Sequence, residues 1–331
     1  MIGLRMAISS STPIPVLDGW ALAKDLSKGD WVFSKEGKPI QIKSIQTYTP
    51  AEMFCVALSD GVYLDVDDHT KFPVQTLFDR QTESRYRGIY KRWAKQKYAS
   101  PLEMLERGLD FGYNQAFYSV RTTQPIHFPF EDHPVPPFIV GMWMTRTNPN
   151  NRYMLRESVV EYVQKEIRST GWSFKMHARN VMEIRPSIRT SFLTRYQVVP
   201  SKLPIEYTFG SVEQRIDLLR GIVATKPGCY NQKLDKFLIF SRDLNFLITI
   251  QGICESLGMK TQVFDNKTSI THQLAFKTSI KLHPEQSQAK ISKHFDRRIV
   301  KTIEKIDPKP SIHIVTDEPF VVGQGFLPIW H

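Results

Sequence analysis

Cysteine is scarce in this sequence, and long apolar segments are absent. The three cysteines, Cys55, Cys229 and Cys254, are odd in number and far apart. This spacing supplies neither a disulfide framework nor a CxxC metal motif, so it predicts a reducing compartment. No apolar run approaches the ~20 residues that a membrane span needs, and the first residues lack the apolar core of a signal peptide. We therefore expect a cytoplasmic protein without a membrane partner.

Acidic residues are fewer than basic ones. The chain of 331 residues has 44 Lys+Arg against 33 Asp+Glu, which gives a net charge of +11. Such an excess favours a polyanionic partner, usually nucleic acid, although charge that serves solubility alone is the alternative. Hydrophobic residues make up 41% of the chain, which excludes a disordered tail and allows two packed domains.

Both ends of the chain have the pattern of β-structure. Over residues 12–75, short apolar runs alternate with turn signals such as Asp18-Gly19 and Asp60-Gly61. The pattern returns from about residue 282, in segments such as Pro319-Phe-Val-Val-Gly. We expect one β domain that is split by a mixed α/β insertion.

Between these ends, residues 85–98 combine cations with aromatic side chains. No acidic residue lies between Ser84 and Ser100. The composition is typical of a nucleic-acid contact, and a solvated loop is the alternative. The cations are Arg85, Arg87, Lys91, Arg92, Lys95 and Lys97. Pro101 through Gly108 then predicts a short helix.

The central part of the chain repeats itself. Two helix-like apolar segments contain Gly141 and Gly221, 80 residues apart, and a second pair, Gly171 and Gly258, is 87 residues apart. Two copies of one unit explain both spacings, and the glycines in the helices would let two backbones approach closely. The alternative is two unrelated core helices, each with a chance glycine.

Five short motifs occur along the chain in a defined order. They are Ser11-Thr-Pro-Ile-Pro, Asp67-Asp-His-Thr, Val140-Gly-Met-Trp-Met, Leu218-Leu-Arg-Gly-Ile-Val and Gly325-Phe-Leu-Pro. The ordered set resembles an intein (Hint) domain of the phage type that carries an inserted LAGLIDADG homing endonuclease. The resemblance implies an α+β fold, with a horseshoe-like all-β domain formed by both chain ends around a two-repeat αββαββ insertion. It implies Hint segments at 1–130 and 281–331, a LAGLIDADG domain at 131–280, and a basic DNA-contact insertion at about 80–110.

At the splicing positions of the family, this sequence departs from the pattern. The first position, which needs a Cys or Ser nucleophile, is Ala7, and a methyl group cannot attack a carbonyl. Val66 replaces the usual Thr three residues before the central histidine, His69, which we expect to be a structural core histidine. The family ends in His-Asn, whereas this chain ends in Trp330 and His331. The resemblance therefore predicts that splicing is lost.

The cleavage positions depart in the same way. The family carries an acidic residue at the foot of each LAGLIDADG helix, and the pair holds a divalent metal beside the scissile phosphates. Those positions are Arg146 and Lys226 here. Two cations repel Mg²⁺ and attract phosphate, so we expect no metal site, no cofactor and a contribution of both residues to DNA binding.

These observations predict an intein-derived, LAGLIDADG homing-endonuclease-like protein that is inactive in splicing and cleavage. We expect a freestanding gene product retained as a DNA-binding or accessory subunit of a phage or mobile-element machine, in the cytoplasm of a bacterial or phage-infected cell. Its expected partners are double-stranded DNA and a phage protein complex. Two alternatives stay open: an active intein with a site-specific endonuclease, and a purely structural, protein-binding subunit.

Overall fold

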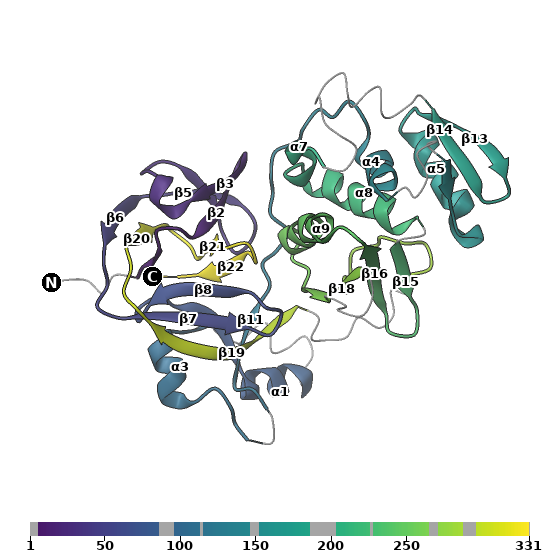
Figure 1. The fold of residues 1–331 in the computed structure, drawn as a ribbon. Coiled ribbons are helices and arrows are strands. Elements are labelled where there is room, and N and C mark those ends of the chain that lie inside the picture. The colour runs from purple at the N-terminus through teal and green to yellow at the C-terminus, as the bar shows by residue number, and fades with distance from the viewer. Residues whose placement is uncertain are drawn as a thin grey trace. The chain divides into compact units, whose positions relative to one another are not determined.

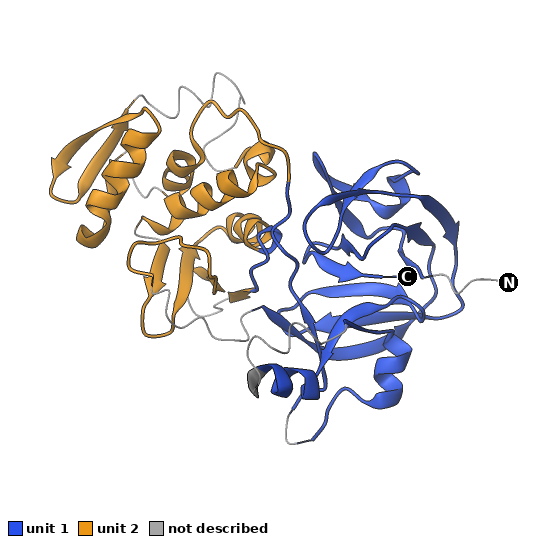
Figure 2. Cartoon of the chain, turned by 180° about the vertical axis from the view of Figure 1, so that it is seen from behind, with its two compact units in different colours: residues 1–127, 255–260, 293–331 blue, residues 128–254, 261–292 orange. Residues whose placement is uncertain are grey.

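The protein forms two compact units, shown in Figure 2. The first contains residues 1–127, 255–260 and 293–331, and the second contains residues 128–254 and 261–292. The computed structural model describes residues 6–85, 96–112, 115–145, 152–185, 203–225, 228–264, 271–286 and 296–330. The sequence placed its domain boundaries near residues 130 and 280. The division by contacts also assigns 255–260 to the first unit, where the Ile126 amide donates to Ser256 O at 2.8 Å.

In its described residues, the first unit contains a nine-stranded antiparallel sheet (Figure 1). Its order is β10 (Lys97–Ala99), β9 (Phe72–Thr76), β11 (Tyr118–Arg121), β19 (Arg297–Ile306), β7 (Met53–Leu58), β8 (Tyr63–Asp67), β1 (Ile8–Ser9), β20 (Ser311–Val315) and β6 (Ser44–Tyr48). Three hairpins accompany it: β2 (Pro13–Val16) with β3 (Gly19–Leu22), β4 (Trp31–Phe33) with β5 (Pro39–Gln41), and β21 (Phe320–Val322) with β22 (Leu327–Ile329).

Strands from the two chain ends alternate in this sheet. β1 lies between β8 and β20, with Ile8 opposite both Val66 and Ile312. β19 lies between β7 and β11. Strands from both chain ends therefore pair in one sheet.

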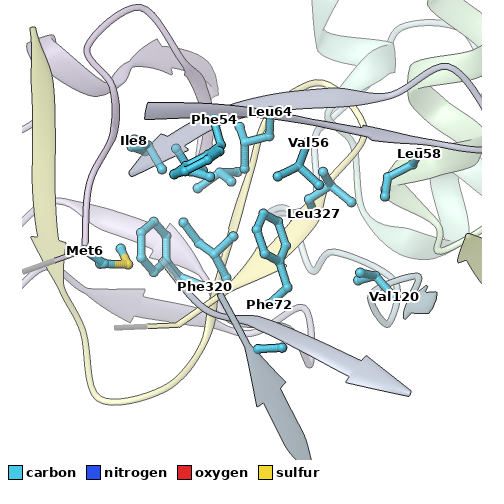
Figure 3. Packing of buried hydrophobic residues seen from close by; sticks show 14 of the residues in the cluster. Met6, Ile8, Phe54, Val56, Leu58, Leu64, Phe72, Val120, Phe320 and Leu327 are labelled. Carbon is cyan, nitrogen blue, oxygen red and sulfur yellow. The ribbon is translucent and has the colours of Figure 1, made fainter. Parts of the chain in front are cut away.

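The core of the first unit mixes side chains from both ends as well (Figure 3). Met6, Ile8 and Phe54 from the N-terminal part are buried together with Phe320 and Leu327 from the C-terminal part. Burial of such side chains stabilises a fold by about 1.5–3 kcal/mol each. Neither end can bury these residues without the other.

Among its described residues the first unit has two α-helices, α1 (Leu77–Arg85) and α3 (Pro101–Arg107). α3 begins with a complete capping box between Ser100 and Glu103 and has Pro101 in its first turn. The prediction of a short helix after residue 100 is confirmed.

The second unit consists of two copies of one arrangement. The first copy contains α4 (Pro137–Met144), β12 (Arg152–Met154), α5 (Val160–Ser169), β13 (Ser173–Ala178) and β14 (Val181–Arg185). The second contains α8 (Val212–Val223), β15 (Gly228–Asn231), β16 (Lys236–Ser241), α9 (Leu244–Ser256), β17 (Thr261–Phe264) and β18 (His272–Phe276). The first copy has the sheet order β12-β14-β13, and the second copy has β15-β16-β18-β17. The two orders match when the edge strand β15 is left out. The second copy follows the αββαββ order, and the first shows one strand between its helices within the described residues.

α4 and α8 cross in direct backbone contact. A Cβ on Gly141 would lie 2.1 Å from Leu218 O, and a Cβ on Gly221 would lie 2.0 Å from Phe138 O. Only a residue without a side chain fits at either position. The predicted contact between the two glycine-containing helices is confirmed.

The second glycine pair ends a helix in each copy. Gly171 and Gly258 follow α5 and α9, and both have φ of +76°, a conformation that favours glycine. The 87-residue spacing therefore marks the same turn twice. No helix in the described part of the chain has the length and apolarity to cross a membrane.

We expect Gly141→Ala and Gly221→Ala each to destabilise the protein by about 3 kcal/mol or more, because overpacking here pushes against backbone. Gly252→Ala in α9 is the matched control, since a Cβ there meets nothing within 4 Å. That control is expected to stabilise the helix by about 0.5–1 kcal/mol. Urea unfolding measures all three variants, and equal effects at the three positions would contradict the close crossing.

Candidate functional site

The segment that contains Ala7 is buried in the middle of the first unit. Ala7 is 0% exposed and Met6 is 1% exposed. The carbonyl oxygen of Ala7 accepts the amide of Asp67 at 2.9 Å and lies 3.0 Å from Thr70 Oγ1. The carbonyl oxygen of Met6 lies 2.6 Å from Nδ1 of His313 on β20. Both carbonyls of this segment are thus held by groups that are distant in sequence.

Asp67 organises the turn that follows β8. Its Oδ1 accepts the Thr70 amide at 2.8 Å and lies 2.6 Å from Thr70 Oγ1, and its Oδ2 accepts the Tyr48 hydroxyl at 2.9 Å. Asp67 is 1% exposed and Thr70 is fully buried. The carboxylate therefore directs Thr70 inward, beside the carbonyl of Ala7.

His69 does not occupy the core, so its prediction as a structural core histidine is wrong. Its side chain is 42% exposed, and its Nδ1 lies 3.7 Å from the Asp68 carboxylate. The turn capped by Asp67 brings residue 70 inside and leaves residue 69 at the surface. Val66, at the position where the family usually has Thr, is a buried apolar residue of β8.

The C-terminal end of the described chain lies beside the same turn. Trp330 forms an antiparallel bridge with Lys71, with amide-to-carbonyl distances of 2.8 and 2.9 Å. The structure therefore brings Ala7, the 67–71 turn and Trp330 into one region. His331 is outside the described residues.

Cys55 is a poor nucleophile in this fold. It lies on β7 opposite Asp65 and Glu304. Burial raises the pKa of the Cys55 thiol to about 11, together with the hydrogen bond and charge of Asp65 and the charge of Glu304. At neutral pH this thiol supplies almost no thiolate.

In the second unit, α4 and α8 end in a pair of hydroxyl groups. The Thr225 hydroxyl donates to Thr145 Oγ1 at 2.6 Å, and Thr145 Oγ1 lies 2.9 Å from Met142 O. Both threonines are buried, and like the glycines they are 80 residues apart. Arg146 and Lys226 follow them directly in the sequence, but both lie outside the described residues.

The groups at these helix ends do not fit a divalent metal. Mg²⁺ is held by carboxylate and carbonyl oxygens, whereas Thr145 and Thr225 are bonded to each other and to the ends of their own helices. In sequence, the next residues are cations. We therefore assign no metal chemistry to this place.

The sheet of the first copy presents charged side chains on one face. Alternation along the strands puts Tyr153, Met182 and Ile184 in the core. The opposite face carries Arg152 and Lys175, both opposite Glu183 in register. That face also carries His177 and Arg185, which contact Glu183 at 2.5 and 3.2 Å. Arg152, Lys175 and Arg185 therefore lie on the same face as Glu183, and Arg185 forms an ion pair with it.

The corresponding face of the second copy is less charged. Phe240 and Phe264 are both directly opposite Gln273, so the three residues form one row across β16, β18 and β17. Phe240 is 39% exposed and Phe264 is 41% exposed. Phe237 and Ile239 face the core instead. The two copies thus share an architecture and differ in surface chemistry.

Most of the predicted basic segment, namely Arg87, Lys91, Arg92 and Lys95, is outside the described residues. Arg85 ends α1, and its side chain is also not described. Lys97 forms an ion pair of 2.7 Å with Asp79, and its side chain is 55% exposed.

α1 is anchored to the sheet before that segment begins. The carboxylate of Glu83 accepts hydrogen bonds from Arg121 at 2.5 and 2.6 Å and from Arg297 at 2.6 Å. Burial opposes the charge of Glu83, but the hydrogen bonds and charge of Arg121 hold its pKa below the ordinary value. Glu83 therefore ties α1 to β11 and β19.

Comparisons with known proteins give partial similarity. No family model matches the sequence. The chain is 21% identical over 304 residues to the replicative DNA helicase DnaB of Mycobacterium intracellulare, which is 87% of this chain and 50% of that protein. The chain therefore spans about half the length of this curated relative.

The solved structures similar to this chain include inteins and a homing endonuclease. The Msm DnaB1 intein splicing domain bound with zinc has a TM-score of 0.20 and 24% identity, over 21% of this chain and 56% of that one. The homing endonuclease I-DmoI in complex with DNA and Mn has a TM-score of 0.30 and 11% identity, over 44% of this chain and 89% of that one.

The motifs do not indicate the role of two residues of the site. His313 lies within an apolar strand pattern, and Thr70 is the residue after the histidine on which the resemblance centres. Their spacing to Ala7 carries no signal, because β1, β8 and β20 become neighbours only in the folded sheet. A polar residue within an apolar strand pattern, as at His313, is the feature of the sequence that points to a buried hydrogen-bonding side chain.

We expect Cys55 to react with iodoacetamide about a hundredfold more slowly than a free cysteine at pH 8, because the thiolate is the nucleophile. The rate should rise as the pH approaches 11, where the thiol ionises. Peptide mass spectrometry after timed labelling measures the rate at Cys55. Urea-unfolded protein is the control and should react normally, whereas fast labelling of the folded protein at pH 8 would contradict the raised pKa.

Proposed function

We propose that this chain is an intein-derived, LAGLIDADG homing-endonuclease-like protein that binds duplex DNA and has lost splicing and cleavage. The observation that carries the proposal is the crossing of α4 and α8. Two helices 80 residues apart meet at Gly141 and Gly221 and end in the Thr145–Thr225 hydrogen bond. This is the arrangement that the resemblance implies for a paired LAGLIDADG motif.

DNA binding is supported by charge. The outer face of the first copy carries Arg152, Lys175 and Arg185 around a single acidic residue, Glu183. Cations on a solvent-facing sheet suit phosphate contacts, whereas glutamine and apolar side chains, as on the second copy, suit contacts with base edges. The net charge of +11 agrees with a polyanionic partner.

Loss of cleavage is supported by the residues at the helix ends. Arg146 and Lys226 occupy the positions where the family carries its metal-binding acids. A pair of cations at such a place attracts phosphate and repels Mg²⁺.

Loss of splicing is supported at Ala7. Ala7 has no nucleophilic atom, and the thiol of Cys55 is held protonated. The protein is expected to stay intact during purification.

An accessory role completes the proposal. The sequence relative is a replicative DNA helicase, which suits a protein that acts beside DNA in a phage or mobile-element machine. Cytoplasmic localisation and a phage protein complex as second partner belong to the same proposal.

We expect binding to a random-sequence duplex to weaken steeply with salt, because each neutralised phosphate adds about −0.9 to the slope of log K against log salt. Arg152→Ala, Lys175→Ala and Arg185→Ala combined should flatten the slope by about 2–3. Combined Arg85→Ala, Arg87→Ala, Lys91→Ala and Arg92→Ala should also flatten it by a few units. Fluorescence anisotropy at several salt concentrations measures these slopes.

The matched control removes three exposed cations from the first unit, Lys24, Lys43 and Lys305. It should leave the slope nearly unchanged, since these residues lie on neither proposed surface. Absence of duplex binding at low salt would overturn the proposal and favour a protein-binding subunit.

We expect plasmid DNA to remain uncut with Mg²⁺ or Mn²⁺, because cations replace both acids. Arg146→Asp combined with Lys226→Asp is expected to restore Mg²⁺ binding in calorimetry by creating two carboxylate ligands. A plasmid library incubated with the wild-type protein tests the loss of cleavage. Specific double-strand breaks that vanish on Lys226→Ala would show an active endonuclease instead.

A further inference from the structure

The two copies of the second unit have one row of side chains in common. In the first copy the row across β12, β14 and β13 is Arg152, Glu183 and Lys175. In the second copy the row across β16, β18 and β17 is Phe240, Gln273 and Phe264. Residues at the same place in the two rows are 88, 89 or 90 residues apart, close to the 87-residue spacing of the turn glycines. The central strand therefore carries a carboxylate in one copy and an amide of the same shape in the other.

Both carboxylate oxygens of Glu183 have partners on the outer face of the sheet. Oε2 lies 2.5 Å from Nε2 of His177, and Oε1 lies 3.2 Å from Nε of Arg185. The hydrogen bond from His177, together with the hydrogen bond and charge of Arg185, holds the pKa of Glu183 below its ordinary value. The carboxylate is therefore ionised at neutral pH and only accepts hydrogen bonds, so Nε2 of His177 is the donor.

Further cations lie on both sides of this carboxylate. Arg152 and Lys175 are its direct cross-strand partners, and the Cβ atoms of such partners are about 4.5–5.5 Å apart. The side chain of Glu183 is 25% exposed, whereas that of Arg185 is 54% exposed. Arg152 and Lys175 are exposed as well. The acidic side chain thus lies at the centre of the group, and the permanent cations around it face solvent.

A phosphate group suits the donors that hold Glu183. Arginine and histidine N–H groups that donate to a carboxylate also donate to a phosphate, because both anions offer charged oxygen acceptors. The carboxylate of Glu183 therefore occupies the place that a bound phosphate would take. At the corresponding place of the second copy, Gln273 is uncharged and lies between two phenylalanines.

We propose that His177, Arg185, Arg152 and Lys175 form a phosphate site that Glu183 fills until a backbone phosphate of duplex DNA displaces it. The inference rests on the proposed function, since its ligand is a duplex. When the phosphate binds, the hydrogen bonds of His177 and Arg185 pass from the carboxylate to the phosphate oxygens. Glu183 therefore lowers the affinity of the first copy for DNA.

The test replaces Glu183, in the full chain, by the residue that the second copy carries. Glu183→Gln keeps the shape and removes the charge, so two charge contacts no longer have to be broken before a phosphate binds. We expect the affinity for a random-sequence duplex to rise about tenfold, about threefold for each exposed contact. Fluorescence anisotropy at one fixed, low salt concentration measures the affinity.

The matched control is Glu157→Gln, which removes the same charge outside the row. Glu157 forms an ion pair with Arg179 at 3.5 Å. This control should change the affinity by less than about twofold. Glu183→Thr, which suits a strand, is a second variant in case glutamine lowers the stability. Thermal melts confirm that each variant is folded.

A further background separates a phosphate site from a general effect of net charge. In a chain with His177→Ala and Arg185→Ala, the two donors that Glu183 blocks are gone. Glu183→Gln added to that chain should therefore raise the affinity by less than about twofold, because the gain is coupled to the donors. A general effect of net charge would give the same gain with and without them.

The proposal is overturned if folded Glu183→Gln and Glu183→Thr bind the duplex no better than Glu157→Gln. A lower melting temperature without a gain in affinity would show an ion pair that only stabilises the sheet. An equal gain without His177 and Arg185 also overturns it. In these cases DNA binding by the wild-type chain would still sustain the proposed function. Absence of binding by the wild-type chain and every variant would reject the proposed function and this site together.

Discussion

The backbone contact between α4 and α8 is the constraint on which the second unit depends. At Gly141 and Gly221 the helices approach until there is no room for a single methyl group. That closeness brings the ends of both helices together, so that Thr145 and Thr225 share a hydrogen bond. Each helix leads into its own sheet, and the two copies therefore extend from one shared centre. A wider crossing would separate the hydroxyls and leave two buried polar groups without each other.

The first unit depends on a different constraint, the joining of its two chain ends. Arg298 on β19 forms an ion pair with Asp60, which follows β7, and their side chains are 1% and 0% exposed. Arg298 also donates to the carbonyl of Gly325, ahead of β22. A buried charge that loses its partner costs about 3–5 kcal/mol, so this pair favours one register between the ends. His313 lies on β20, which pairs with β1 in the same sheet, with Ile312 opposite Ile8.

Sequence patterns predicted the architecture better than the site. The glycine spacing predicted the helix crossing, because helices that pack backbone to backbone need glycine at the point of contact. Short apolar runs that alternate with turn signals at both chain ends predicted β-structure there, because this pattern is typical of paired strands. His313 could not be predicted in this way, since it contacts Met6 across 307 residues of sequence. Thr70 could not be predicted either, since it meets Ala7 only in the folded chain, across 63 residues. The prediction for His69 was wrong for a related reason. The Asp67 carboxylate holds Thr70 inward, and the neighbouring His69 therefore faces outward.

The order of strands in the nine-stranded sheet has a consequence for folding. β7 precedes its partner β19 by roughly 240 residues, as the bond between Ser59 and Ile299 illustrates. At a synthesis rate of about 5–20 residues per second, β19 is made roughly 10–50 s after β7. The second unit lies within that interval and holds its own partners, so it can fold first. Of the two units, the first therefore has the higher contact order, the slower folding step and the greater need for a chaperone during synthesis.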